Sequence, residues 1–391
     1  MKATTRRLDR LPDLVDIAAG DGLLFARDGA GLAGRGVAAR VPVADADAFL
    51  RGVERDDDVR RPGTGPVAFG ALPFEPGAGG ELILPAVVVG RHGDGTGWMT
   101  TIDDAELDAT PAPPPRPRGG AFSLCPGFDP ESFQKAVASG RQAVREGRVT
   151  KVVLARDVHV EAEHPIDIHA VLTRLRASFG SSHLYAVDGF IGASPELLVA
   201  RHGDVVRAHP LAGTSPRTGD PATDARLAAQ LIASTKDQVE HRVTIQMVHD
   251  TLLPWCSYLD WEAEPSIVTV ANVQHLGTLV EGRLSKPEPS VLDLVAALQP
   301  TPALGGYPRA EALALIAELE PFDRGPYGGP VGWVDADGNG QWAVAIRGAD
   351  ISGRHARLLA GVGVVADSDL DAELAETQAK FQAMLSAIVR P

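Results

Sequence analysis

The sequence predicts an α+β fold built on antiparallel sheets. Residues 184–206 show the alternation of short strands that turn back at Gly189 and again at 202–204. A second hairpin is predicted around the turn-rich tetrad 337–340, which two apolar runs flank. Because hairpins alternate only loosely with helical stretches, a doubly wound parallel sheet is disfavoured.

Other elements follow from their periodicity. Residues 130–146 place apolar side chains at helical spacing, and the β-branched run 152–160 is typical of a strand. Asp167 is expected to cap a helix. Residues 357–365 predict a further strand, and a final helix is expected to begin near Asp369.

The first 110 residues are expected to form short strands joined by loops. The apolar run 83–89 is one such strand, while Pro and Gly at 62–66 and 76–80 interrupt the pattern. A Pro-rich stretch, Pro111 to Gly120, can continue neither a helix nor an inner strand. It is expected to be a linker or a long surface loop.

Composition narrows the class of protein. The 391 residues are 44% hydrophobic and carry a formal net charge of -14, which predicts a globular chain that repels nucleic acid and anionic membranes. Cys125 and Cys256 have no Cys or His at ligand spacing, so neither a disulfide scaffold nor a zinc site is expected. No apolar run is long enough for a signal peptide or a membrane span, so a cytoplasmic protein is expected.

Two predicted helices carry paired carboxylates. Asp237 and Glu240 share one helix face, and Glu373 and Glu376 repeat the spacing, with Lys380 one turn further on. Taken alone, such faces are most often solvated, and a Glu–Lys pair at i,i+4 stabilises a helix by only about 0.2–0.5 kcal/mol. If the two helices converge, however, four carboxylates make a hard-oxygen site suited to Mg²⁺.

Eight motifs, in this order along the chain, together resemble the chorismate-utilising enzymes, the superfamily of isochorismate, salicylate, anthranilate and aminodeoxychorismate synthases. The motifs are KVVLAR at 151–156, GASPELL at 192–198, LAGT at 211–214, KDQVEH at 236–241, PTPAL at 300–304, GPVGW at 329–333, IRGA at 346–349 and SDLDAELAETQAK at 368–380. The likeness runs from about Phe128 to Ile388.

The resemblance implies a fold like that of anthranilate synthase component I, with two antiparallel sheets, helices outside them and the active site between the sheets. Residues 119–391 are then the chorismate-binding catalytic region. Residues 1–118 are expected to be integrated into the same fold, which makes the Pro-rich stretch a loop within it.

The resemblance also implies Mg²⁺ as cofactor and chorismate as substrate. Glu240 and Glu376 are the expected ligands of the ion, and Asp237 and Glu373 are expected to hold metal-bound waters. The ion would bridge the protein to the ring carboxylate of chorismate, because four carboxylates would otherwise repel a dianionic substrate.

The implied reaction converts chorismate to isochorismate by adding water at ring C2 with loss of the C4 hydroxyl. The resemblance assigns Lys151 as the general base that activates the water and Glu196 as the general acid that protonates the departing hydroxyl. Burial is expected to keep Glu196 protonated. Substrate contacts are implied at Gly213, Thr214, His275, Ala303, Leu304, Arg347, Gly361, Gly363 and Lys380.

Three positions discriminate among the members of the superfamily. Lys151 favours water as nucleophile, because the ammonia-using synthases generally carry a non-basic residue there. Ala212 stands where aminodeoxychorismate enzymes generally place a nucleophilic lysine. Residues 300–308, followed by Arg309, are similar to the isochorismate-synthase form of that segment. A salicylate synthase, which also eliminates pyruvate, and a catalytically silent ligand-binding relative remain as alternatives.

Two residues depart from the isochorismate-synthase pattern, and both bear on the expected pocket shape. Gln299 stands where His is usual, and Val362 where Ala is common. No glutamine amidotransferase segment is apparent, so neither an amidotransferase subunit nor a nucleic-acid or membrane partner is expected, and a monomer is favoured. Sequence does not decide whether the product feeds menaquinone, siderophore or salicylate synthesis.

Overall fold

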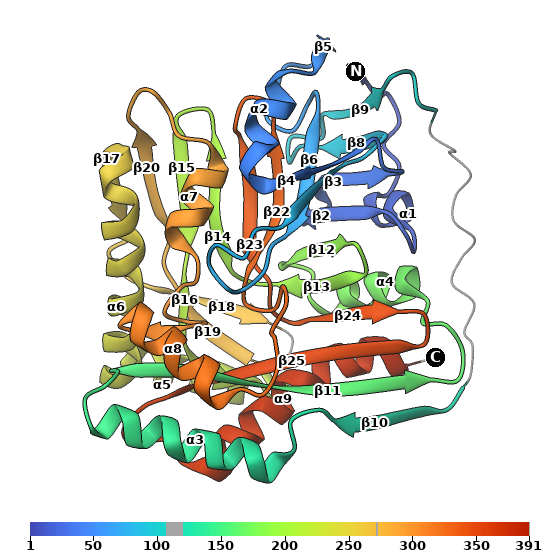
Figure 1. Cartoon of the computed structure of the whole chain (residues 1–391). Coiled ribbons are helices and arrows are strands. Elements are labelled where there is room, and N and C mark those ends of the chain that lie inside the picture. The colour runs from blue at the N-terminus through green and yellow to red at the C-terminus, as the bar shows by residue number, and fades with distance from the viewer. Residues whose placement is uncertain (107–119, 271–272, 391) are drawn as a thin grey trace.

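The computed structural model describes residues 1–106, 120–270 and 273–390 (Figure 1). The Pro-rich stretch predicted over 111–120 lies outside these residues except for Gly120. Among the described strands, β1 (Lys2–Arg7) and β5 (Glu54–Asp57) pair in parallel, and every other pairing is antiparallel. The α+β class with antiparallel sheets is therefore confirmed.

The larger sheet contains thirteen of the described strands. β21 (Gly306–Tyr307) pairs with β11 at one end of that strand. The remaining strands follow in the spatial order β10 (Phe122–Pro126), β11 (Lys151–Ala162), β25 (His355–Val364), β24 (Gly348–Ser352), β13 (Phe190–Ser194), β12 (His183–Val187), β2 (Leu23–Arg27), β3 (Ala30–Arg35), β8 (Val87–Arg91), β9 (Gly97–Ile102), β1 and β5.

Nine described strands form a second sheet, and three more form a small third sheet that the sequence did not predict. The nine-stranded sheet has the order β17 (Cys256–Trp261), β20 (Val280–Leu284), β15 (Val205–His209), β14 (Leu197–His202), β23 (Gly340–Val344), β22 (Pro330–Asp335), β6 (Val67–Ala71), β7 (Glu81–Leu84) and β4 (Ala39–Pro42). The small sheet has the order β16 (Leu211–Pro216), β19 (Val273–Gly277) and β18 (Ser266–Val270).

Helices pack against the sheets. Figure 1 shows α6 and α7 beside the nine-stranded sheet and α3 and α9 beside β11 and β25. Short 3₁₀ turns occur at Val43–Asp45 and Leu253–Trp255. The described α-helices are α1 (Leu14–Ala18), α2 (Ala46–Arg51), α3 (Pro130–Arg145), α4 (Ile168–Ser178), α5 (Pro221–Ala233), α6 (Thr235–Leu252), α7 (Val291–Leu298), α8 (Arg309–Leu319) and α9 (Leu370–Val389).

The chain passes between the two larger sheets at several points, and we call three of the short connections sheet crossings. They lie between β7 and β8 at Pro85, between β13 and β14 at Pro195, and between β23 and β24 at 345–347. Proline lacks a backbone N–H and cannot donate to a ladder, which suits a point where the strand leaves one sheet for the other. Two of these crossings deliver side chains to the cavity described below.

Strands from the first hundred residues extend both larger sheets. β2 pairs with β12 in the thirteen-stranded sheet, and β6 pairs with β22 in the nine-stranded sheet. A core cluster with Phe25, Phe69, Trp98, Tyr185 and Trp333 contains side chains from both sheets. Burying each such large side chain stabilises the fold by roughly 1.5–3 kcal/mol, so these residues hold the two sheets together.

The main predicted elements are confirmed. Asp167 and Asp369 cap α4 and α9 by accepting hydrogen bonds from backbone N–H groups three residues on, and the hairpins turn at Gly189, at 202–204 and around 337–340. The prediction of one strand over 83–89 is wrong, because Pro85 divides it into β7 and β8 of different sheets. Among the described helices, none is both long enough and apolar enough to cross a bilayer.

Candidate active site

A cavity of about 420 Å³ gathers residues from four strands, two helices and the intervening loops. Every site residue predicted from the sequence lines it, although these residues are spread over more than half of the chain. They are Lys151, Glu196, Gly213, Thr214, Asp237, Glu240, His275, Ala303, Leu304, Arg347, Gly361, Gly363, Glu373, Glu376 and Lys380. The structure therefore brings the predicted set together, whereas the role of each residue remains a prediction.

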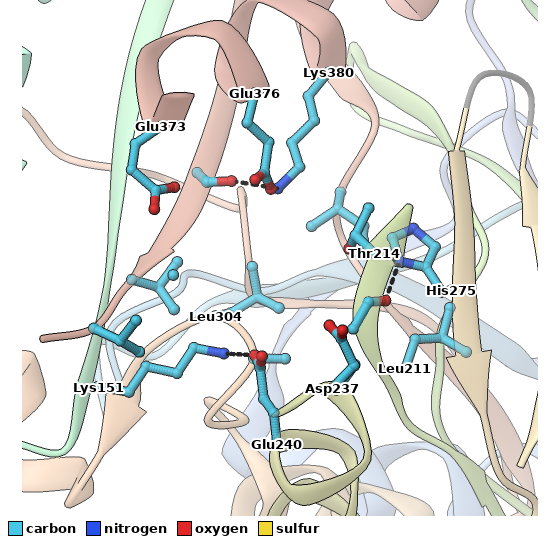
Figure 2. Close-up of a pocket in the computed structure, with 18 of the residues that line it drawn as sticks. Lys151, Leu211, Thr214, Asp237, Glu240, His275, Leu304, Glu373, Glu376 and Lys380 are labelled. Carbon is cyan, nitrogen blue, oxygen red and sulfur yellow. Dashed lines mark hydrogen bonds and ion pairs between the residues drawn. The ribbon is translucent and has the colours of Figure 1, made fainter. Parts of the chain in front are cut away.

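The four carboxylates lie on opposite sides of this cavity. Asp237 and Glu240 extend from α6, and Figure 2 shows Glu373 and Glu376 facing them from α9. Ser234 fixes the start of α6 by accepting a hydrogen bond from the Asp237 N–H at 3.3 Å. The two helices thus converge on one space, which spacing along the sequence could not establish.

Each of the two expected metal ligands contacts a lysine. Lys151 Nζ lies 2.5 Å from Glu240 Oε1, and Lys380 Nζ lies 2.5 Å from Glu376 Oε1 and 2.8 Å from the Gly361 carbonyl oxygen. Within the described ranges, no three His, Cys, Asp or Glu side chains are grouped closely enough to hold a metal ion by themselves. On each side of the cavity, one carboxylate is thus already paired with a lysine.

Glu196 lies at a sheet crossing, directly after Pro195, and is only 3% exposed. Burial raises the pKa of its carboxyl from 4.5 to about 8, although a backbone hydrogen bond from Leu211 and the charges of Arg347 and Lys151 oppose the shift. At neutral pH this carboxyl is therefore mainly protonated. A buried, protonated carboxylic acid beside a substrate-sized cavity can donate a proton to a leaving group.

Arg347 occupies the other sheet crossing that reaches the cavity. Its backbone has φ = 56°, a left-handed conformation that is uncommon for residues other than glycine. The Tyr185 hydroxyl donates to the Ile346 carbonyl oxygen at 3.1 Å, and a Cβ at Gly348 would lie only 2.2 Å from that hydroxyl oxygen. Tyr185 and Gly348 thus hold the segment that presents the Arg347 guanidinium, whose pKa is lowered by burial.

Gly213, Thr214 and His275 form a second wall on the small sheet. β16 has an irregular register between Ala212 and Thr214, and Gly213 there adopts φ = 75°. His275 Nδ1 lies 3.2 Å from the Gly213 carbonyl oxygen, which can only accept, so this nitrogen carries the proton. Burial lowers the pKa of His275 to about 3, which makes it a neutral hydrogen-bonding group.

Glycines on β25 make room for the reacting side chains. A Cβ at Gly363 would lie 2.6 Å from Lys151 Cε, and a Cβ at Gly361 would lie 3.2 Å from the Tyr327 hydroxyl oxygen. Val362, between them, is 1% exposed and belongs to the core. Gln299 instead donates to the Phe74 carbonyl oxygen at 3.2 Å. Neither Val362 nor Gln299 lines the cavity.

A buried ion pair supports two further cavity residues. Arg324 and Glu320 are 3% and 2% exposed in their side chains and lie 2.5 Å apart. Arg324 also donates to the carbonyl oxygens of Leu304 at 2.9 Å and Val153 at 2.7 Å, while Glu320 accepts from the Ala155 N–H at 2.7 Å. The pair thus fixes the turn of Leu304 against β11, which begins at Lys151.

Sequence reasoning left several lining residues without a role. Tyr327 lies at the cavity wall with a pKa raised by burial, and Asp367 and Asp369 add acidic groups near the start of α9. The sequence does carry a signal near Tyr327, because the motif at 329–333 begins two residues after it. Asp369 belongs to the motif at 368–380, but the sequence predicts for it only the start of a helix.

The chain matches a known protein family over most of its length. Residues 101–389 match the family model described as chorismate binding enzyme, and the chain belongs to that family. It is 37% identical over 335 residues to isochorismate synthase DhbC of Bacillus subtilis strain 168, a match that covers 83% of this chain and 81% of that relative.

Solved structures show the same fold. MenF, the menaquinone-specific isochorismate synthase from Escherichia coli, superposes with a TM-score of 0.86 at 24% identity and covers 100% of this chain and 94% of its own. Anthranilate synthase component I from Streptococcus pneumoniae gives a TM-score of 0.71 at 22% identity, with 98% and 92% covered. The expected likeness to the anthranilate synthase component I fold is confirmed.

Proposed function

We propose that this chain isomerises chorismate to isochorismate, adding water at ring C2 and releasing the C4 hydroxyl as water. One observation carries the proposal: a single cavity holds an amine, Lys151, together with a buried carboxylic acid, Glu196, whose pKa lies near 8. A hydroxyl shift needs one group to take a proton from the attacking water and another to protonate the departing hydroxyl. The similarity to a relative named isochorismate synthase supports this reaction.

Cationic and neutral donors on the cavity wall are suited to the two carboxylates of chorismate. Arg347 offers a planar fork that matches a carboxylate in two hydrogen bonds. Lys380 and the Thr214 hydroxyl line the same space, and Gly213 allows close approach of the ligand to the backbone. Such contacts would orient the ring so that its C2 and C4 positions face Lys151 and Glu196.

Lys151 is proposed to accept the proton of the attacking water. Its side chain is 16% exposed and touches Glu240, so the amine must break this contact before it can reach the attacking water. Gly363 keeps the space around Lys151 Cε clear. Glu196 then gives its proton to the C4 hydroxyl, and the two residues exchange protonation states over the reaction, so that no net proton is consumed.

The carboxylates fit Mg²⁺ as a cofactor. Glu240 and Glu376 each contact an ammonium group at 2.5 Å, so both carboxylates already bind a positive charge, and Mg²⁺ would replace the lysine at each. Mg²⁺ characteristically takes one or two protein carboxylates together with substrate oxygens and waters, so a site without three clustered ligands suits it. Bound there, the ion would supply positive charge that offsets the repulsion between chorismate and the acidic helices.

Product analysis tests the proposal. The pure protein is incubated with chorismate and Mg²⁺, and the product mass and pyruvate are followed. An isomer of equal mass without pyruvate is expected. Stoichiometric pyruvate would instead identify a salicylate synthase or another lyase, and no turnover would identify a ligand-binding relative.

The role of Lys151 has its own test. Lys151→Ala is expected to retain binding of Mg²⁺ and chorismate and to lose isomerisation. Lys135→Ala is the matched control, because Lys135 is 72% exposed and forms an i,i+4 pair with Glu131. Activity retained by Lys151→Ala would show that another group activates water.

The remaining expectations are part of the same proposal. We expect the enzyme to act as a cytoplasmic monomer without an amidotransferase subunit, since one chain supplies all the residues proposed for binding and chemistry. Relatives named for menaquinone and for vibriobactin, a siderophore, make both routes candidates for the product. Sedimentation of the pure protein with chorismate checks the monomer, and a stable dimer would contradict it.

A further inference from the structure

The two carboxylates that α6 contributes to the cavity lie on the part of the helix that is outside the core. Among residues 235–240, no side chain that the structure describes is buried. Asp237 and Glu240 are therefore not held in place by apolar packing of their own turns. The described buried side chains of α6 recur at helical spacing along one face, and they are His241, Thr244, Ile245, Val248 and Leu252.

The first of these buried residues, His241, makes a polar contact with the residue that follows the small sheet strand β19. His241 is 1% exposed, and its Nε2 lies 2.7 Å from the hydroxyl oxygen of Thr278, which is also 1% exposed. His241 directly follows Glu240 and lies one helical turn beyond Asp237. The hydrogen bond therefore fixes α6 at the point where its buried face meets the cavity.

Thr278 is itself held closely by the small sheet. It directly follows Gly277, which pairs with Leu211 of β16 on one side and with Ser266 of β18 on the other. A Cβ at Gly277 would lie 2.6 Å from Val268 Cγ2 and 2.8 Å from Leu211 Cδ2, so the backbone is tightly enclosed there. The hydrogen bond thus joins α6 to the sheet that forms the second wall of the cavity.

Stability alone does not explain a histidine at this position. His241 Nδ1 is buried and has no hydrogen-bond partner among the residues that the structure describes, and such an atom destabilises a fold. An apolar side chain would avoid this loss and would continue the buried face of α6. It would not fix the direction of the helix, however, because apolar contacts are not directional. A directional contact directly after an expected metal ligand favours a role in placing that ligand.

We propose that the hydrogen bond between His241 and Thr278 positions the first turns of α6, so that their carboxylates can share a Mg²⁺ ion with those of α9. His241 is then a positioning residue, because its side chain does not line the cavity. It ends the motif at 236–241, and the proposed isomerisation gives it no role. The inference rests on the proposed function, since it concerns the ion that the reaction is proposed to use.

Calorimetric titration with Mg²⁺ tests the positioning role without turnover. The parent for this titration is the full chain carrying Glu196→Gln, which is expected to be inactive, and it is saturated with chorismate before Mg²⁺ is added. Adding Thr278→Val, which keeps the shape of the side chain and removes its hydroxyl, should weaken Mg²⁺ binding about tenfold, as loss of groups that support metal ligands does. Thr278→Ser keeps the hydroxyl and should restore the affinity of the parent. His241→Leu removes the same hydrogen bond from α6, should have the effect of Thr278→Val, and replaces that variant if it does not fold.

Steady-state kinetics of the chain with Glu196 intact give a second measurement. Thr278→Val should raise the Mg²⁺ concentration needed for half the maximal rate by the same factor as in the titration. It should leave kcat at saturating Mg²⁺ within about twofold of the parent, because the contact acts through binding of the ion. Val248→Ala is the stability control, since it removes core volume from the same helix face. It should lower the unfolding temperature and leave the Mg²⁺ affinity unchanged.

The outcomes separate the positioning role from the proposed function. The positioning role alone is overturned if the parent binds Mg²⁺ and Thr278→Val binds it equally well, or if Thr278→Ser does not restore the affinity. It is also overturned if Val248→Ala weakens Mg²⁺ binding as much as Thr278→Val does, because the effect would then follow from stability. A parent that binds no Mg²⁺ would overturn the proposed cofactor together with the positioning role.

Discussion

Replacing Arg324 with lysine tests whether the buried ion pair positions the cavity wall. Arg324 bonds three acceptors in different directions: the Glu320 carboxylate and the carbonyl oxygens of Leu304 and Val153. A single ammonium cannot span all three, so about two charge-assisted hydrogen bonds are lost. At roughly 1.5–3 kcal/mol each, the free energy of unfolding should fall by about 3 kcal/mol or more.

The assay combines thermal unfolding with steady-state kinetics. Arg324→Lys should lower the unfolding temperature by several degrees, at roughly 2 °C for each kcal/mol in a domain of this size. Its kcat/KM for chorismate should also fall at least about tenfold, because Leu304 and the strand of Lys151 are no longer held together.

A matched arginine separates positioning from general destabilisation. Arg357 also pairs with a buried carboxylate, Asp157, at 2.8 Å and lies over Phe322, but its side chain is 29% exposed and contacts no cavity residue. Arg357→Lys should cost at most about 1 kcal/mol and leave kcat/KM unchanged. If Arg324→Lys has the same stability and the same kcat/KM as the parent, the positioning argument is refuted.

Three further outcomes follow from the site. The wild-type rate should fall as pH rises through about 8, where Glu196 ionises. Because the folded pKa of Glu196 exceeds the 4.5 of the free side chain, its contribution to stability should be lost as pH rises from 4.5 to about 8. Glu196→Gln should be inactive, and its unfolding temperature should lack this pH dependence. Gly363→Ala should lower kcat about tenfold or more with little change in unfolding temperature, since the added methyl displaces only the flexible end of Lys151, and an unchanged kcat would contradict this. Tyr185→Phe should cost about 1 kcal/mol and raise KM by loosening Arg347, whereas a KM equal to the parent's would show that this hydroxyl does not hold it.

Local chemistry explains why the elements could be predicted. Asp167 and Asp369 stand where side-chain oxygens satisfy the first N–H groups of a helix. The hairpin turns lie at Gly189 and Gly338, where φ is positive. These signals act over a few residues and need no knowledge of the rest of the chain.

Pairings between distant segments could not be predicted in this way. The apolar run 83–89 gave no sign that Pro85 separates strands of different sheets, because both halves are equally buried. The Lys151–Glu240 contact joins residues 89 positions apart, whereas Glu376–Lys380 was visible from helix spacing. The shared cavity was expected from the resemblance to a family, not from spacing.

The interleaving of early strands with both sheets bears on where the chain could be divided. A fragment that began at residue 119 would keep nearly all of the region matched by the family model, yet it would strip β2 from β12 and β6 from β22. β12 and β22 would then become edge strands, whose unpaired N–H and C=O groups can pair with a neighbouring molecule. Such a fragment should aggregate even though it retains all the residues proposed for chemistry, so the boundary of a family match is no guide to what can fold alone.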